Sequence, residues 1–200
     1  MTLLKAKIDT CVIAAGGQGT RLRALDPDRP KALTPILGEP ILSCQINLLV
    51  QSGIKNFHLL LNYHAEQIIN FIEKKYKNPQ LTFTYYTENV PLGSGGGLVN
   101  IYQDLPSLFL FTYCDIYFDI NLDKLLHFHM CKNADFTLVC HPNDHPFDSD
   151  LIELDKTGRV VSLSSCPHSL DTFPGNVVNA AFYVVNRDLL KNFEHGVKRD

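Results

Sequence analysis

Residues 8–22 have the sequence IDTCVIAAGGQGTRL. The nearly continuous apolar run at 8–14 has the length of a buried β-strand, and glycines follow it at positions 16, 17 and 19. Glycine lets the backbone approach a ligand closely and turn successive N–H groups inward, as binding of phosphate oxygens requires. The stretch therefore predicts a strand that ends in a phosphate-binding loop.

This loop departs from two common nucleotide-binding patterns. It fails G-x-G-x-x-G because Leu22 stands three residues after Gly19, and it lacks the G-K-[ST] ending of a Walker loop. A nicotinamide-dependent enzyme and an ordinary P-loop ATPase are therefore disfavoured.

Strand and helix patterns alternate beyond the loop. The first half predicts strands at 56–61, 81–86 and 108–113, and helices at 41–53, 64–76 and 97–103. Crossovers of this length indicate an α/β sandwich, in which helices cover both faces of a mainly parallel sheet. After a loose boundary near residue 116, the pattern predicts a helix at 122–131, strands at 136–140 and 177–185, a hairpin of 151–154 with 160–163, and a helix opening at 188–193.

Composition excludes several classes of protein. The 200 residues carry 18 Lys and Arg against 21 Asp and Glu, a net charge of −3, and they contain no basic run. Neither nucleic acid nor a membrane is therefore an expected partner. We expect a cytoplasmic protein because no apolar run approaches a bilayer span or a signal peptide. The 6 cysteines form no C-x-x-C pair, which favours buried free thiols.

Two cations follow the glycine loop. Arg21 and Lys31 lie in a connection that Pro30 and Pro35 stiffen. Positive charges beside a phosphate loop neutralise the charge that develops on a transferring phosphoryl group.

At this point the residues resemble a known family. G-G-x-G-T-R-L at 16–22, followed by P-K-x-L-x-P-I at 30–36, resembles the signature of sugar-1-phosphate nucleotidyltransferases. The resemblance implies a Rossmann-like, GT-A-like three-layer α/β sandwich with a mainly parallel central sheet. It also implies one nucleotidyltransferase domain over residues 1–200 that lacks its C-terminal end.

The resemblance assigns roles to these residues. Arg21 would stabilise the leaving pyrophosphate and Lys31 would hold the reacting phosphates, which makes both catalytic. The loop residues that would bind the nucleoside triphosphate are Ala15, Gly16, Gly17, Gly19 and Thr20.

The segment ENVPLGSGG at 88–96 resembles the family's E-x-x-P-L-G-T-A-G element, which binds the nucleotide. The resemblance therefore adds Glu88, Gly93 and Ser94 to the nucleotide-binding residues. The Glu88 carboxylate accepts hydrogen bonds, as the N1–H and 2-amino groups of guanine require, so we expect a preference for GTP.

Asp115 follows the strand at 108–113, at the carboxyl end of a parallel sheet, where ligands bind. A carboxylate there suits Mg²⁺, the expected cofactor. The family has N-G-D at this place, whereas here Tyr113 and Cys114 precede the aspartate.

Two residues of the second half are candidate sugar ligands. Asn179 lies in VVNAAFY, which resembles the family's V-N-A-G-x-Y segment with Ala181 in place of glycine. Asp150 ends the stretch HPNDHPFDSD, and this stretch resembles the branch that activates D-glycero-D-manno-heptose or mannose 1-phosphate with GTP. Members of that branch are often fused to a phosphatase domain, which would lie beyond residue 200.

The expected reaction joins a nucleoside triphosphate to a sugar 1-phosphate and releases pyrophosphate. The family's E-K-P lysine and its second metal-binding aspartate have no counterpart here. A catalytically incomplete nucleotide-binding or regulatory subunit is therefore an alternative, and a cytidylyltransferase acting on a non-sugar phosphate is another. The sequence leaves the oligomeric state open.

Overall fold

The computed structural model describes residues 8–17, 26, 28–88, 92–168 and 175–198. The chain forms two compact units: Met1–Thr137 with Val184–Asp200, and Leu138–Tyr183. Both boundaries fall inside strands and not near residue 116, because a strand of each unit continues into the other.

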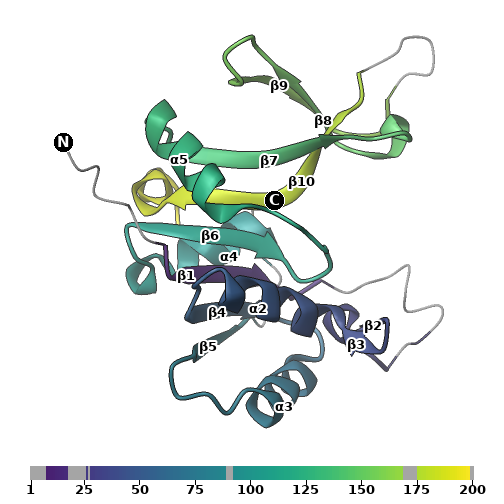
Figure 1. Ribbon diagram of the computed structural model, residues 1–200, viewed down its shortest axis with the longest axis vertical. Coiled ribbons are helices and arrows are strands. Elements are labelled where there is room, and N and C mark those ends of the chain that lie inside the picture. Colours follow the sequence, from purple (N-terminus) through teal and green to yellow (C-terminus); the bar gives the residue numbers. More distant parts are fainter. Residues whose placement is uncertain (1–7, 18–25, 27, 89–91, 169–174, 199–200) are drawn as a thin grey trace. The chain divides into compact units, whose positions relative to one another are not determined.

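A parallel sheet forms the centre of the first unit (Figure 1). Its strands stand in the order β5-β4-β1-β6, and every neighbouring pair among them is parallel. The strands are β1 (Thr10–Ala14), β4 (Asn56–Leu61), β5 (Thr82–Thr87) and β6 (Leu108–Tyr113). The end of β10 (Val177–Asn186) follows β6 in the strand order. The mainly parallel, Rossmann-like sheet expected from the sequence is confirmed.

Helices cover both faces of this sheet. α2 (Ile41–Gln51) buries Leu42, Ile46 and Leu49, and it ends where Gly53 takes a φ of +94°. α3 (Ala65–Lys75) lies on the same face as α2, whereas α4 (Gly93–Asn100) lies on the opposite face (Figure 1). The unit also contains η2 (Tyr102–Asp104), α5 (Leu122–Lys132) and η4 (Arg187–Asn192).

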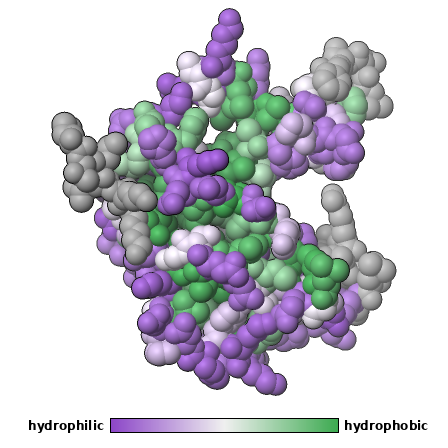
Figure 2. Space-filling view, in the orientation of Figure 1, coloured by the Kyte–Doolittle hydropathy of each residue, from purple (hydrophilic) through white to green (hydrophobic). Residues whose placement is uncertain are grey.

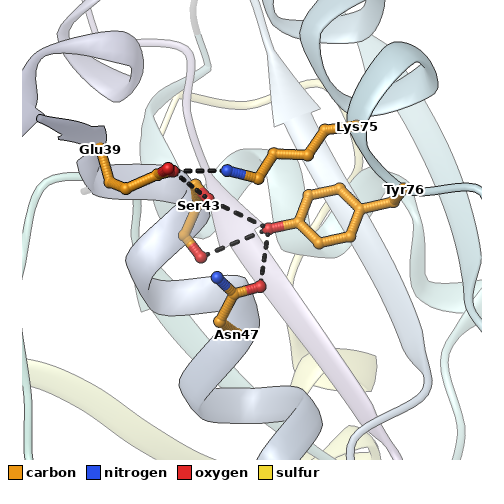
Figure 3. Close-up of polar contacts among 5 residues, drawn as sticks. All are labelled: Glu39, Ser43, Asn47, Lys75 and Tyr76. Atoms are coloured by element: carbon orange, nitrogen blue, oxygen red, sulfur yellow. Dashed lines mark hydrogen bonds and ion pairs between the residues drawn. The ribbon is translucent and has the colours of Figure 1, made fainter.

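The connection from β1 to α2 contains η1 (Lys31–Leu33) and a small hairpin of β2 (Pro35–Ile36) and β3 (Glu39–Pro40). Five polar side chains tie the hairpin to α2 and α3 (Figure 3). Lys75 pairs with Glu39, while the Tyr76 hydroxyl donates to Asn47 Oδ1 at 3.1 Å and lies 3.4 Å from Ser43 Oγ. Hydrogen bonds from Lys75 and Ser43 hold the pKa of Glu39 below its usual value.

The second unit is antiparallel. β8 (Leu151–Leu154) pairs with β9 (Val160–Ser164) on one side and with β10 on the other. β7 (Phe136–Pro142), which begins in the first unit, also pairs with β10, and η3 (Pro146–Asp148) follows β7.

The structure corrects three details. The helix expected at 97–103 begins at Gly93, and its last expected turn is the separate η2. The opening helix expected at 188–193 is a 3-10 helix. All six thiols are free as expected, and Cys11 and Cys114 are buried, but the expectation of burial was wrong for Cys131 and Cys166, which are exposed.

Hydrophobic residues also reach the surface on the face that Figure 2 shows. The hairpin contributes Leu37, which is fully exposed at a φ of +51°. No helix within the described residues is long and apolar enough to cross a membrane. The cytoplasmic location stays a prediction.

Candidate nucleotide and metal site

The carboxyl ends of the four parallel strands meet at one edge of the sheet. Backbone hydrogen bonds join the segments that leave them: Ala15 N–H to Leu60 O at 2.8 Å, Glu88 N–H to Leu61 O at 2.9 Å, and Cys114 N–H to Ala14 O at 3.0 Å. The predicted glycine loop, base segment and metal carboxylate therefore follow β1, β5 and β6 at the same edge of the sheet, where open α/β folds bind ligands.

Gly16 and Gly17 have different surroundings. A Cβ at Gly16 would lie 3.2 Å from Asn62 Cβ and 3.3 Å from Asn62 N, so this glycine packs against the end of β4. A Cβ at Gly17 would meet no atom of the described residues within 4 Å. Among the described residues, the loop therefore packs against Asn62 at Gly16, whereas Gly17 has space beside its Cα.

Three predicted residues, Gly19, Thr20 and Arg21, lie outside the described residues. Their roles in binding the triphosphate and the leaving pyrophosphate stay predictions.

Lys31 and Asp115 form an ion pair between Nζ and Oδ2. Lys31 is the first residue of η1 and follows Pro30 directly. A hydrogen bond of 3.0 Å from Ile41 N–H to Thr34 O then joins the two residues that flank the β2–β3 hairpin. The two side chains are 38% and 28% exposed. The structure therefore brings together the predicted phosphate-binding lysine and the predicted metal carboxylate, while leaving both open to ligands.

The side chain of Gln45 in α2 stabilises the turn that carries Asp115. Its Nε2 donates to Tyr113 O at 2.8 Å and also to Ile116 O, so both hydrogens of the amide are used. Burial raises the pKa of the adjacent Cys114 thiol to about 12, which keeps that thiol neutral. Gln45 was not among the predicted residues, although a lone polar residue on an otherwise apolar helix stripe was available as a signal.

Glu88 lies against the start of α4. Its Oε2 accepts a hydrogen bond of 3.1 Å from Leu92 N–H, and a Cβ at Gly97 would lie 2.9 Å from its Oε1. Asn62, also missed from the sequence, donates to Glu88 O at 2.6 Å. The predicted base acceptor therefore also caps a helix, and Asn62 links it to the glycine loop.

Two further predicted residues lie at the start of α4. Gly93 is its first residue and has a φ of +70°, a conformation that glycine adopts without strain. Ser94 follows it in the first turn of the helix.

The surroundings of Asp115 fit Mg²⁺. Within the described part of the chain, no group of three or more His, Cys, Asp or Glu side chains is arranged to hold a metal ion. Mg²⁺ commonly uses one or two carboxylates and completes its shell with water and substrate phosphates. A single partly exposed carboxylate beside a lysine and an open glycine loop suits a cation that arrives with phosphates.

The predicted sugar ligands belong to the second unit, and both make hydrogen bonds within that unit. Asn179 accepts from Ala181 N–H at 2.9 Å and donates to the Tyr183 hydroxyl at 2.6 Å. Asp150 Oδ1 accepts from Cys166 N–H at 3.2 Å. Both side chains therefore stabilise the backbone or a neighbouring side chain of this unit, and their roles toward a sugar stay predictions.

Residues 10–199 match the family described as Nucleotidyl transferase. The chain belongs to that family. This membership covers the glycine loop, the Lys31–Asp115 pair and the segment at Glu88, and it agrees with the resemblance found in the sequence.

Relatives of this chain include enzymes named for guanylyl transfer. It is 30% identical over 192 residues to the mannose-1-phosphate guanylyltransferase catalytic subunit beta of Drosophila pseudoobscura, covering 92% of this chain and 49% of the relative. It is 28% identical over 193 residues to mannose-1-phosphate guanyltransferase 2 of Candida glabrata, covering 92% and 51%. The chain spans about half the length of the curated relatives it matches.

Solved structures share the fold. HddC from Yersinia pseudotuberculosis superposes with a TM-score of 0.80 at 24% identity, covering 95% of this chain and 82% of HddC, and a second crystal structure of HddC is complexed with GMP-PN. UDP-glucose pyrophosphorylase complexed with UDP-glucose gives a TM-score of 0.76 at 14% identity, covering 92% and 78%.

Proposed function

We propose that this chain transfers a guanylyl group from GTP to a sugar 1-phosphate, giving a GDP-sugar and pyrophosphate. Membership of the nucleotidyl transferase family supports the reaction type. The names of the relatives support guanine as the base and mannose 1-phosphate as one acceptor.

In the proposed reaction, a phosphate oxygen of the sugar 1-phosphate attacks the α-phosphorus of GTP. A new oxygen–phosphorus bond forms as the bond between the α-phosphorus and the bridging oxygen breaks, and pyrophosphate leaves with that oxygen. The nucleophile is already an anion, so no side chain has to remove a proton from it. Positioning and charge neutralisation therefore supply most of the catalysis.

The residues of the first unit fit these tasks. No described atom lies within 4 Å of a Cβ at Gly17, so this side of the loop would accept the triphosphate, and Lys31 would supply a positive charge to it. Asp115 would hold Mg²⁺, which neutralises phosphate charge when bound. Arg21 would bind the leaving pyrophosphate.

Glu88 is the proposed determinant of the base. Its carboxylate is held at the start of α4 by Leu92 N–H, and a carboxylate matches the two donors on the edge of guanine. Mannose 1-phosphate and D-glycero-D-manno-heptose 1-phosphate are both proposed acceptors. The stretch at 141–150 supports this branch of the family.

The observation that carries the proposal is the Lys31–Asp115 pair, which sets a phosphate-binding cation against a metal-binding carboxylate at the edge of the sheet. The test incubates the purified chain with Mg²⁺, each sugar 1-phosphate and each of the four ribonucleoside triphosphates, and it follows pyrophosphate release. We expect release with GTP and at least one of the two sugars.

Variants of the pair make the test specific. Lys31→Ala and Asp115→Asn should each lower turnover about 10²–10³-fold, as loss of a preorganised charge partner does. Lys75→Ala is the matched control, since it breaks a comparable lysine–carboxylate pair in the cluster of Figure 3. Near-normal turnover of Lys31→Ala would contradict the proposal. GTP binding without any pyrophosphate release would favour the regulatory subunit, and release with CTP alone would favour a cytidylyltransferase.

A further inference from the structure

Gln45 occupies a costly position for a polar side chain. It is 0% exposed and lies on the same stripe of α2 as the fully buried Leu42, Ile46 and Leu49. Burying an amide among apolar side chains is unfavourable unless its hydrogen bonds are made. A leucine at this position would extend the apolar stripe of α2 without burying a polar group.

Both hydrogen bonds that the Gln45 side chain makes within the described residues go to one turn. Tyr113 O, at the end of β6, and Ile116 O lie on either side of Cys114 and Asp115, and both accept from Gln45 Nε2. A single rigid amide therefore bridges the two carbonyls that flank the proposed metal carboxylate. Without this amide, both carbonyl oxygens would lose a buried hydrogen-bond donor, and the distance between them would no longer be fixed.

The other end of the same amide is left unsatisfied. Gln45 Oε1 is buried and has no hydrogen-bond partner within the described residues. A buried acceptor without a partner destabilises the folded state. The Gln45 side chain thus satisfies the carbonyls of the turn while its own acceptor stays without a partner. This arrangement favours a functional reason for the amide over a purely structural one.

We propose that Gln45 is a positioning residue that fixes Asp115 for Mg²⁺ in the proposed guanylyl transfer. The inference rests on the proposed function, because it takes Asp115 as the metal ligand. Gln45 contacts the backbone of the turn and acts on the metal only through the carboxylate. Partners of this kind, one shell away from a metal, typically change metal affinity or activity 10–100-fold when replaced.

The test measures metal binding directly. Mn²⁺, which replaces Mg²⁺ and is visible by electron paramagnetic resonance, is titrated into the protein in the presence of GTP. Gln45→Leu should weaken Mn²⁺ binding at least about tenfold. It should also lower kcat for pyrophosphate release while leaving the KM for the sugar 1-phosphate unchanged, because the acceptor site is untouched.

Ser43→Ala provides the matched control. Ser43 lies on the same helix and is equally buried, but it contacts Glu39 and Tyr76 in the cluster of Figure 3 instead of the Asp115 turn. Urea unfolding measures the stability that each variant loses. If Gln45 supports only the fold, the two variants should show the same Mn²⁺ affinity.

A second substitution covers a failure of Gln45→Leu to fold. Gln45→Asn keeps the amide but is one methylene too short to bridge both carbonyls, so it should weaken Mn²⁺ binding as well. Wild-type Mn²⁺ affinity in a folded Gln45 variant, with binding lost in Asp115→Asn, would overturn the role of Gln45 alone. Wild-type Mn²⁺ affinity in Asp115→Asn would overturn the metal assignment and the role of Gln45 together.

Discussion

A methyl group added at Gly17 tests whether the loop after β1 binds the triphosphate. An alanine Cβ there has no described atom within 4 Å, and the φ of Gly17 lies outside the left-handed region. The folded state therefore accepts Gly17→Ala. Because alanine has less freedom than glycine in the unfolded chain, the free energy of unfolding should rise by about 0.4–1 kcal/mol.

Nucleotide binding should respond in the opposite direction. The methyl group stands on the open side of the loop, where backbone N–H groups have to come within hydrogen-bond distance of phosphate oxygens. Keeping those oxygens away should raise the Kd for GTP at least about tenfold, or about 1.4 kcal/mol. Isothermal titration calorimetry with GTP and urea unfolding measure the two effects on the same protein.

Gly16→Ala is the matched comparison. Its Cβ would lie 3.2 Å from Asn62 Cβ, so crowding should lower the free energy of unfolding by about 1–3 kcal/mol. A folded Gly17→Ala protein that binds GTP with the wild-type Kd would refute the assignment of this loop to the phosphates.

Three further outcomes are expected. Ala181→Gly relieves a residue held at a φ of +56°, so in urea unfolding it should be about 1–2 kcal/mol more stable than the neighbouring Ala180→Gly, and equal stabilities would contradict the strain. Glu88→Gln should reduce the ratio of GTP to ATP turnover in pyrophosphate release, and an unchanged ratio would exclude Glu88 as the determinant of the base. Burial lowers the pKa values of His58 and His129 from 6.5, so below about pH 6.5 the unfolded chain binds more protons than the folded one, and stability should fall as the pH drops. Replacing His129 with Gln should flatten this decrease between pH 7.5 and 5.5, whereas an equally steep slope would show that this histidine does not contribute to it.

The sequence predicts the strands of the first unit well because each is a short apolar run bounded by turn residues. β4 and β6 have the expected ends, at 56–61 and 108–113. The start of α4 was missed because glycine disfavours helices by about 1 kcal/mol per residue. Packing outweighs that propensity here, since a Cβ at Gly97 would lie 2.9 Å from both Leu60 Cδ1 and Glu88 Oε1.

The residue types and motifs in the sequence identify part of the site. The other part depends on which residues the fold brings into contact. Lys31 and Asp115 were predicted separately, from a motif and from a strand end, but their direct contact depends on how the connection after β1 returns to β6. Gln45 and Asn62 act through backbone atoms of distant segments. Such contacts produce no spacing pattern in the sequence. The sequence signal for Gln45 is its place as a polar residue within an apolar stripe.

The contact between Lys31 and Asp115 also affects how a nucleotide and its metal ion would bind. Partly exposed ion pairs contribute only about 0–1 kcal/mol, so little energy holds these two side chains together. An incoming triphosphate offers the lysine a more highly charged partner, and its metal ion offers the carboxylate another. Without ligands, each group thus neutralises the charge of the other, and in the proposed reaction a metal–nucleotide complex would replace both partners at once.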